Sequence, residues 1–99
     1  MAQSFETLAY ETLALDRPHP HVLRVTLNRP EAGNATNTRM GQELWEVFRQ
    51  FYIDFDAARC IIVTGAGKLF CGGGDLKERD GMTDAAWQRQ HALFEQAFM

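Results

Sequence analysis

A glycine-rich segment at residues 64–78, with the sequence TGAGKLFCGGGDLKE, holds the residue types that could do chemistry. Consecutive glycines leave backbone N–H groups free to face a ligand and let that ligand approach the main chain closely. A flexible solvent loop is the plainer alternative. A strand is expected before the segment and a helix after it, and this setting favours a ligand-binding site.

Two familiar nucleotide-binding motifs do not fit this segment. A P-loop needs a glycine five residues before the glycine of its Gly-Lys pair and Ser or Thr after the pair, but Ile62 and Leu69 stand there. A dinucleotide fingerprint that starts at Gly65 needs a glycine at position 70, where the chain has Phe70. The segment is therefore neither of these phosphate-binding loops.

Other reactive side chains give weaker signals. His19 and His21 could supply half of a metal site, but their flanking prolines favour a solvated loop, so no metal is predicted. Cys60 and Cys71 are expected to be free thiols, because the N-terminus lacks the basic and apolar regions of a signal peptide. The same absence predicts a cytoplasmic protein.

The elements that must position the glycine segment follow from periodicity. Two strands are expected at residues 7–15 and 21–27, where β-forming residues alternate with others. Between them, residues 16–21 contain two prolines, which remove backbone donors and are expected to interrupt the strands. A third strand is expected at residues 58–64, and its apolar run with β-branched residues indicates a buried strand.

Two amphipathic helices complete the expected order. The first is capped by Asn37 or Thr38, and the second begins at Thr83 or Asp84 and runs toward Met99. The apolar face of the first consists of Met40, Leu44, Val47, Phe48, Phe51 and Phe55. The apolar face of the second consists of Trp87, Leu93, Phe94 and Phe98. The order of two strands, helix, strand, loop and helix is typical of an α/β protein.

Length and composition exclude several classes of protein. The 99 residues allow one small domain, and 45% hydrophobic with 23% charged residues is typical of globular rather than disordered chains. A formal net charge of −3 offers no basic face for nucleic acid. No apolar run approaches the roughly 20 residues of a membrane-spanning helix. We therefore expect no nucleic-acid and no membrane partner.

Three sequence blocks together match a known family in order and spacing: VTLNRPE at 25–31 leading to Asn34-Ala35, IIVTGAG at 61–67, and FCGGGDLKE at 70–78. They resemble the crotonase superfamily, also called the enoyl-CoA hydratase/isomerase family, over roughly residues 8–99. The resemblance implies an α/β fold of crotonase-like ββα units, the N-terminal portion of the family's spiral fold. Residues 1–99 are then the N-terminal part of a single domain whose C-terminal half is absent.

The resemblance also implies a site. In this family two backbone N–H groups form an oxyanion hole that polarises a thioester carbonyl, and Gly74 matches one donor. The segment that lines CoA, together with a position lying against it, matches Ala32, Gly72, Gly73, Gly74, Asp75, Leu76 and Lys77. CoA is part of the acyl-CoA thioester substrate, so no separate cofactor is implied. The resemblance further implies a homo-oligomer, a trimer or hexamer, and a lyase or isomerase role in fatty acid metabolism.

The sequence departs from the family in ways that leave the reaction open. Gly33 stands where a basic residue often meets CoA phosphates, and the second donor and the catalytic carboxylates match no residue here. Glu31, Glu43 and Glu78 are assigned no catalytic role. Hydration and isomerisation therefore stay equally open. We expect an acyl-CoA-processing protein that is inactive as these 99 residues alone; the alternative is a non-catalytic CoA-binding or assembly module.

Overall fold

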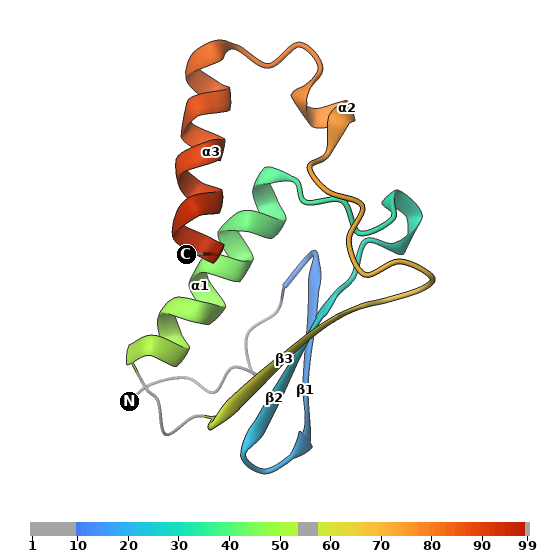
Figure 1. Ribbon diagram of the computed structural model, residues 1–99, viewed down its shortest axis with the longest axis vertical. Helices are drawn as coiled ribbons and strands as arrows, with labels where there is room; N and C mark the ends of the chain where they lie inside the picture. Colours follow the sequence, from blue (N-terminus) through green and yellow to red (C-terminus); the bar gives the residue numbers. More distant parts are fainter. Residues whose placement is uncertain (1–9, 54–57, 99) are drawn as a thin grey trace.

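The structure is a computed structural model that describes residues 10–53 and 58–98, with side chains at 10–50 and 58–97. Its main elements occur in the predicted order (Figure 1), with two short helical elements, η2 and α2, that were not predicted. They are β1 (Leu13–His19), β2 (Val22–Leu27), η2 (a 3-10 helix, Pro30–Ala32), α1 (Thr38–Ile53), β3 (Cys60–Gly65), α2 (Leu76–Arg79) and α3 (Asp84–Phe98). The predicted α/β class is confirmed.

The three strands form one sheet in the order β1-β2-β3, so β2 is the central strand. β1 is antiparallel to β2, and β3 is parallel to β2. Alternate residues of β2 are buried, as expected for a strand with one face against a core. That core joins the buried residues of β2 to the apolar face of α1: Leu23, Val25, Leu27, Met40, Leu44 and Val47.

The predicted interruption at residues 16–21 is wrong for residues 16–19 and correct only for the turn at residues 20–21. β1 begins at Leu13, so residues 10–12 of the predicted strand lie before it, while the part before residue 10 lies outside the described residues. β1 then continues through residues 16–19 and includes Pro18. Proline is tolerated there because β1 is the outer strand of the sheet, where a missing N–H need not break a ladder. The pairing with β2 is also irregular between Asp16 and His19.

The prediction that β3 is buried is also wrong for the described residues. Ile62 is 43% exposed and Val63 is 37% exposed. β3 is the other outer strand, and β2 is the only described strand that pairs with it. A run of apolar residues indicates burial only where neighbouring elements cover both faces.

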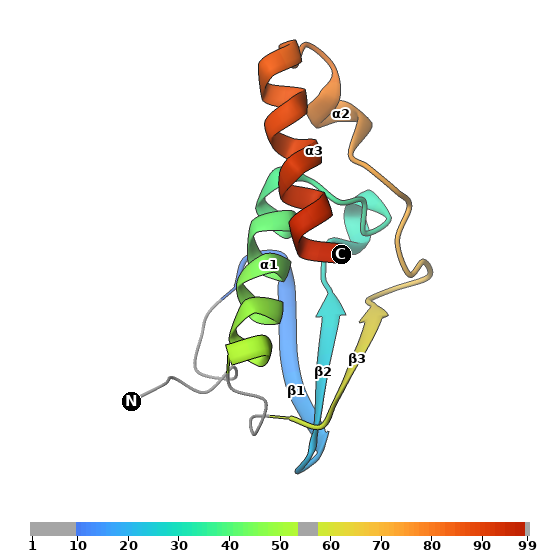
Figure 2. The same ribbon diagram turned by 60° about the vertical axis from the view of Figure 1, so that its left-hand side comes forward.

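Helix α3 runs alongside α1 in both views (Figures 1 and 2). Gly41 permits this approach, because a Cβ at that position would lie 2.5 Å from the ring of Phe94. Trp87 does not join the expected apolar face: it is 46% exposed, and its ring stacks on His91. The expected core positions Phe51, Phe55 and Phe98 lie outside the described side chains. No helix in the described ranges is long and apolar enough to cross a membrane.

Candidate functional site

Residues 33–36 and 72–75 pair with each other as two short parallel segments. The Thr36 N–H donates to the Gly73 carbonyl oxygen at 2.7 Å, and the Asp75 N–H donates to the Thr36 carbonyl oxygen at 3.0 Å. This pairing ties the glycine segment that follows β3 to the turn that follows β2. Backbone atoms near residue 74 are therefore held by a partner about 40 residues away in sequence.

The pairing leaves the backbone N–H of Gly74 unused. Thr36 makes both hydrogen bonds of the bridge with its own N–H and C=O, so the N–H of Gly74 points away from it. Within the described residues this N–H donates to no acceptor. Gly74 thus carries a backbone donor that is fixed in direction and available to a ligand. Such a preoriented donor can stabilise negative charge on an oxygen.

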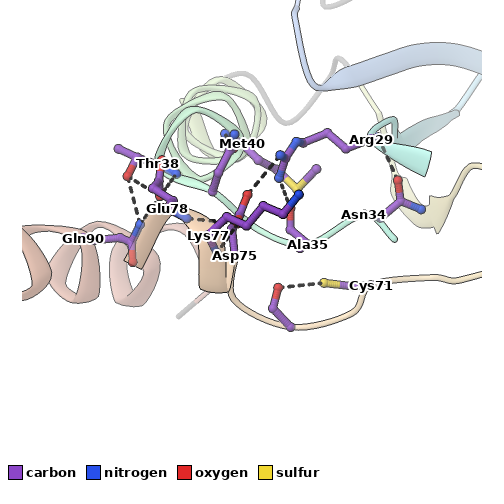
Figure 3. A network of polar contacts seen from close by, with 12 residues as sticks. Arg29, Asn34, Ala35, Thr38, Met40, Cys71, Asp75, Lys77, Glu78 and Gln90 are labelled. Atoms are coloured by element: carbon purple, nitrogen blue, oxygen red, sulfur yellow. Dashed lines mark hydrogen bonds and ion pairs between the residues drawn. The ribbon is translucent and has the colours of Figure 1, made fainter. Parts of the chain in front are cut away.

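An ion pair between Arg29 and Asp75 holds this pairing in place (Figure 3). Arg29 Nη2 lies 3.0 Å from Asp75 Oδ2, and Arg29 Nη1 donates to the Ala35 carbonyl oxygen at 2.6 Å. The other oxygen of Asp75 caps α2 by accepting from the N–H groups of Lys77 and Glu78. The hydrogen bond from the Glu78 N–H, helped by Arg29, lowers the pKa of Asp75 and keeps it ionised.

Asn34 fixes the turn from inside. It is fully buried with φ of 56°, a left-handed conformation that asparagine tolerates. Its Nδ2 donates to the carbonyl oxygens of Ala66 and Leu69 at 2.8 and 2.7 Å, and its Oδ1 accepts from the Arg29 N–H at 2.8 Å. Gly33 before it is also left-handed, and a Cβ there would lie 3.2 Å from Leu69. This explains a glycine where the family often has a basic residue.

These contacts create an open cleft of about 560 Å³ beside Gly74. The cleft brings together six of the seven predicted site residues, and Gly73 is the one that does not line it. The six are Ala32, Gly72, Gly74, Asp75, Leu76 and Lys77. Leu76 is 79% exposed, so an apolar surface is presented at the cleft next to the ammonium-bearing Lys77.

Two of the glutamates that were given no catalytic role bind neighbouring amides and hydroxyls. Glu78 Oε1 accepts from the N–H and Oγ1 of Thr38 at 2.8 and 2.9 Å and from Nε2 of Gln90 (Figure 3). The buried Glu43 accepts from the Thr12 N–H at 2.8 Å. These carboxylates connect elements of the fold. Glu31, by contrast, lines the cleft and is exposed.

Sequence reasoning missed the contributions of Arg29 and Asn34. Both lie in a sequence block that was used for the resemblance, but their partners are 46 and 35 residues further along the chain. The local signal of a turn was the run of turn-forming residue types at 28–35, which includes Pro30, Gly33 and Asn34. Cys60 and Cys71 are both free thiols. The described side chains include no group of three or more His, Cys, Asp or Glu that could hold a metal ion.

Comparisons with known proteins identify the family of this chain. The family described as enoyl-CoA hydratase/isomerase matches residues 18–98. Mevalonyl-coenzyme A hydratase of Beauveria bassiana is 49% identical over 61 residues, 62% of this chain and 21% of that protein. The mitochondrial Delta(3,5)-Delta(2,4)-dienoyl-CoA isomerase of Mus musculus is 44% identical over 69 residues, 70% of this chain and 21% of that protein.

Solved structures show the same likeness in the fold. An enoyl-CoA hydratase from Bacillus anthracis superposes with a TM-score of 0.82 at 32% identity, covering 88% of this chain and 34% of that one. Pseudomonas aeruginosa AtuE gives a TM-score of 0.80 at 36% identity with the same coverage. The chain thus spans about a fifth of the length of these curated relatives and a third of these solved chains. It belongs to the enoyl-CoA hydratase/isomerase family, the crotonase superfamily, as an N-terminal portion of that fold.

Proposed function

We propose that this protein acts on acyl-CoA thioesters by the enoyl-CoA hydratase or isomerase type of reaction, with Gly74 as an oxyanion-hole donor. The observation that carries the proposal is the Gly74 N–H, which its pairing with Thr36 orients and which has no acceptor among the described residues. Removal of a proton from the carbon next to a thioester, or addition of water to the β-carbon of an enoyl thioester, creates an enolate whose negative charge lies on the thioester oxygen. A donor already aimed at that oxygen stabilises this charge without reorganisation.

The CoA portion of the substrate is assigned to the cleft beside Gly74. Ala32, Gly72 and Leu76 give this cleft small and apolar surfaces, and Lys77 adds a positive charge for a CoA phosphate. Gly73 follows Gly72 with φ of 99° and has open space where a side chain would stand. Glycines at these positions allow a ligand to approach the main chain closely.

These 99 residues alone are expected to bind acyl-CoA without turnover. That is the alternative function, a CoA-binding module, and the reaction proposed above needs an acid and a base in addition to Gly74. Hydration requires an acid and a base beside the reacting carbons. Asp75 is paired with Arg29, and Glu78 is engaged by Thr38 and Gln90, so neither is free to act as that acid or base. Glu31 is an exposed carboxylate in the cleft lining, but hydration needs two such groups. We therefore expect the chain to bind acyl-CoA but to add no water to an enoyl-CoA.

Isothermal titration with two ligands tests the proposed role of Gly74. Butyryl-CoA has the thioester carbonyl, whereas S-butyl-CoA is the same molecule with a methylene group in its place. One net hydrogen bond of about 1 kcal/mol predicts roughly fivefold tighter binding of butyryl-CoA. The amide signal of Gly74 in a ¹H–¹⁵N spectrum is expected to shift with butyryl-CoA and much less with S-butyl-CoA. Equal affinities would remove the oxyanion role, and no binding of either ligand would overturn the whole proposal.

Two lysine variants test the placement of CoA in the cleft. Lys77→Ala removes a charge from the lining and is expected to weaken binding of either ligand by about threefold, because exposed ion pairs contribute up to about 1 kcal/mol. Lys68→Ala is the matched control, since Lys68 is exposed and lies outside the cleft lining. The Lys77 effect is expected to shrink at high salt. Equal effects of both variants would contradict the placement.

A further inference from the structure

The guanidinium group of Arg79 lies directly against Gly74. A Cβ built on Gly74 would be 2.7 Å from Cζ of Arg79 and 2.8 and 2.9 Å from its two terminal nitrogens. Arg79 is the last residue of α2, five positions after Gly74, and its side chain turns back to the glycine. A permanent positive charge therefore stands beside the backbone donor of the candidate site.

A buried network holds Arg79 in this position. Its Nε donates to Oε1 of Gln90 at 3.2 Å. Gln90 is only 4% exposed, and its Nε2 donates to Thr38 Oγ1 at 2.9 Å and to Glu78. The network uses the Nε of Arg79 but leaves both terminal nitrogens without an acceptor among the described residues. Those nitrogens form the planar fork that binds a carboxylate through two parallel hydrogen bonds.

Arg79 is not among the residues that line the CoA cleft. Arg29 and Lys77 are the cations that line that cleft. With the thioester oxygen at Gly74 and CoA in the cleft, the group that remains to meet Arg79 is the acyl chain. A neutral aliphatic chain would leave a partly buried guanidinium unpaired, whereas a carboxylate would satisfy it.

We propose that Arg79 is a specificity-determining residue that selects acyl groups bearing a carboxylate a few carbons from the thioester. The inference rests on the proposed function, because it takes Gly74 as the position of the thioester oxygen. It assigns Arg79 no part in the chemical step. This role of Arg79 also requires glycine at position 74, because a side chain there would displace the guanidinium.

The test compares glutaryl-CoA with pentanoyl-CoA, in which a methyl group replaces the terminal carboxylate. Isothermal titration of the 99-residue chain is expected to show about tenfold tighter binding of glutaryl-CoA, the size of one charge-assisted bidentate contact. Arg79→Gln is expected to abolish this preference, and Arg79→Lys to retain only part of it. Arg89→Gln is the matched control: it removes an exposed charge next to Gln90 and is expected to leave the tenfold ratio intact.

Gly74→Ala provides a second route that keeps Arg79. Its Cβ would push the guanidinium away while preserving the backbone N–H, so the glutaryl-CoA preference is expected to fall. Circular dichroism establishes that each variant is folded. Equal affinity of the wild-type chain for both ligands would overturn the inference while leaving the proposed function supported by pentanoyl-CoA binding. A preference that survives in Arg79→Gln would also overturn it, and binding of neither ligand would overturn both proposals.

Discussion

Asp75 links several parts of the site through one residue. Its carboxylate caps α2 and pairs with Arg29, while its backbone N–H donates to Thr36 beside Gly74. The ion pair with Arg29 requires the ionised carboxylate, whereas the cap of α2 requires only a side-chain oxygen acceptor. Loss of the charge and loss of the cap can therefore be separated by substitution, because asparagine keeps the acceptor and alanine keeps neither.

Asp75→Asn and Asp75→Ala are expected to differ in stability by about 1 kcal/mol, the usual contribution of a helix N-cap. The lowered pKa of Asp75 means that the folded state favours the carboxylate. Its contribution is therefore present above the ordinary value near 3.9 and is lost as the pH falls through the lower, folded-state pKa. Urea unfolding should show a gap between wild type and Asp75→Asn at about pH 7 that narrows below about pH 4. A gap that persists undiminished in acid would contradict this assignment.

Tyr10 is a second residue whose pKa is shifted in the folded protein. Its hydroxyl is buried without a hydrogen-bond partner in the described part of the chain. Burial first, and then the charges of Glu46 and Glu43, raise the pKa of Tyr10 to about 12. The unfolded chain ionises near 10, so the contribution of Tyr10 to stability falls as the pH rises from about 10 to about 12.

Tyr10→Phe is expected to increase the free energy of unfolding at neutral pH by up to about 1 kcal/mol, because it removes a buried hydroxyl with no partner. It is also expected to remove the part of the alkaline loss of stability that Tyr10 causes. Urea titrations of both chains at neutral pH and at about pH 11 measure the two effects. A less stable phenylalanine variant at neutral pH would show that the hydroxyl is hydrogen-bonded.

At the scale of elements, the contact between α1 and α3 depends on Gly41. Helical glycine is usually about 1 kcal/mol less favourable than alanine, so a glycine inside α1 needs a reason. The reason is the ring of Phe94, which occupies the space of a Cβ at that position, with Leu93 also close. α3 is the helix that carries Gln90, so this contact also sets the position of the network that holds Arg79.

Gly41→Ala is expected to destabilise the protein by about 1 kcal/mol, since overpacking costs of 1–3 kcal/mol exceed the gain in helix propensity. A double-mutant cycle with Phe94→Leu isolates the contact. In the Phe94→Leu background the smaller side chain leaves room for the Cβ, so the alanine substitution is expected to become neutral or stabilising. If Gly41→Ala stabilises the chain with Phe94 intact, the close helix packing described above is incorrect.

Periodicity correctly predicted the elements whose buried residues follow from the spacing of their own apolar side chains. The alternation of β2 and the apolar positions Met40, Leu44 and Val47 of α1 agree with the buried residues of the structure. The pattern failed at Pro18 and Trp87, because the sequence does not show which strand is outermost or which helix turn faces solvent.

The candidate site also has some residues whose roles the sequence predicted and others whose roles it did not. The glycine segment was predictable because its residue types are unusual and consecutive, and the resemblance named its members. Arg29, Asn34 and Arg79 were not predictable in their roles. Arginine and asparagine have many local uses, and only the folded chain shows that these side chains meet groups on other elements.

At the scale of the whole molecule, exposed large apolar side chains occur on β3, at Ile62 and Val63, and in the glycine segment, at Leu69, Phe70 and Leu76. The radius of gyration is 14.0 Å, above the roughly 13 Å of a compact 100-residue domain, and α3 extends away from the sheet (Figure 1). The two outer strands differ in how their edges are protected. β1 has Pro18, an irregular pairing and charged residues, whereas β3 has the sequence CIIVTG with neither proline nor charge.

We therefore expect this chain to self-associate through the outer edge of β3. An uncharged edge with exposed apolar side chains such as Ile62 is a template for pairing with a second copy. Ile62→Lys is expected to shift sedimentation from dimers or larger species toward monomer. Ala14→Lys is the matched control, because Ala14 is exposed on the protected strand β1, and it is expected to leave association unchanged. Monomeric wild-type chain at high concentration, or equal effects of both lysines, would show that this edge does not drive assembly.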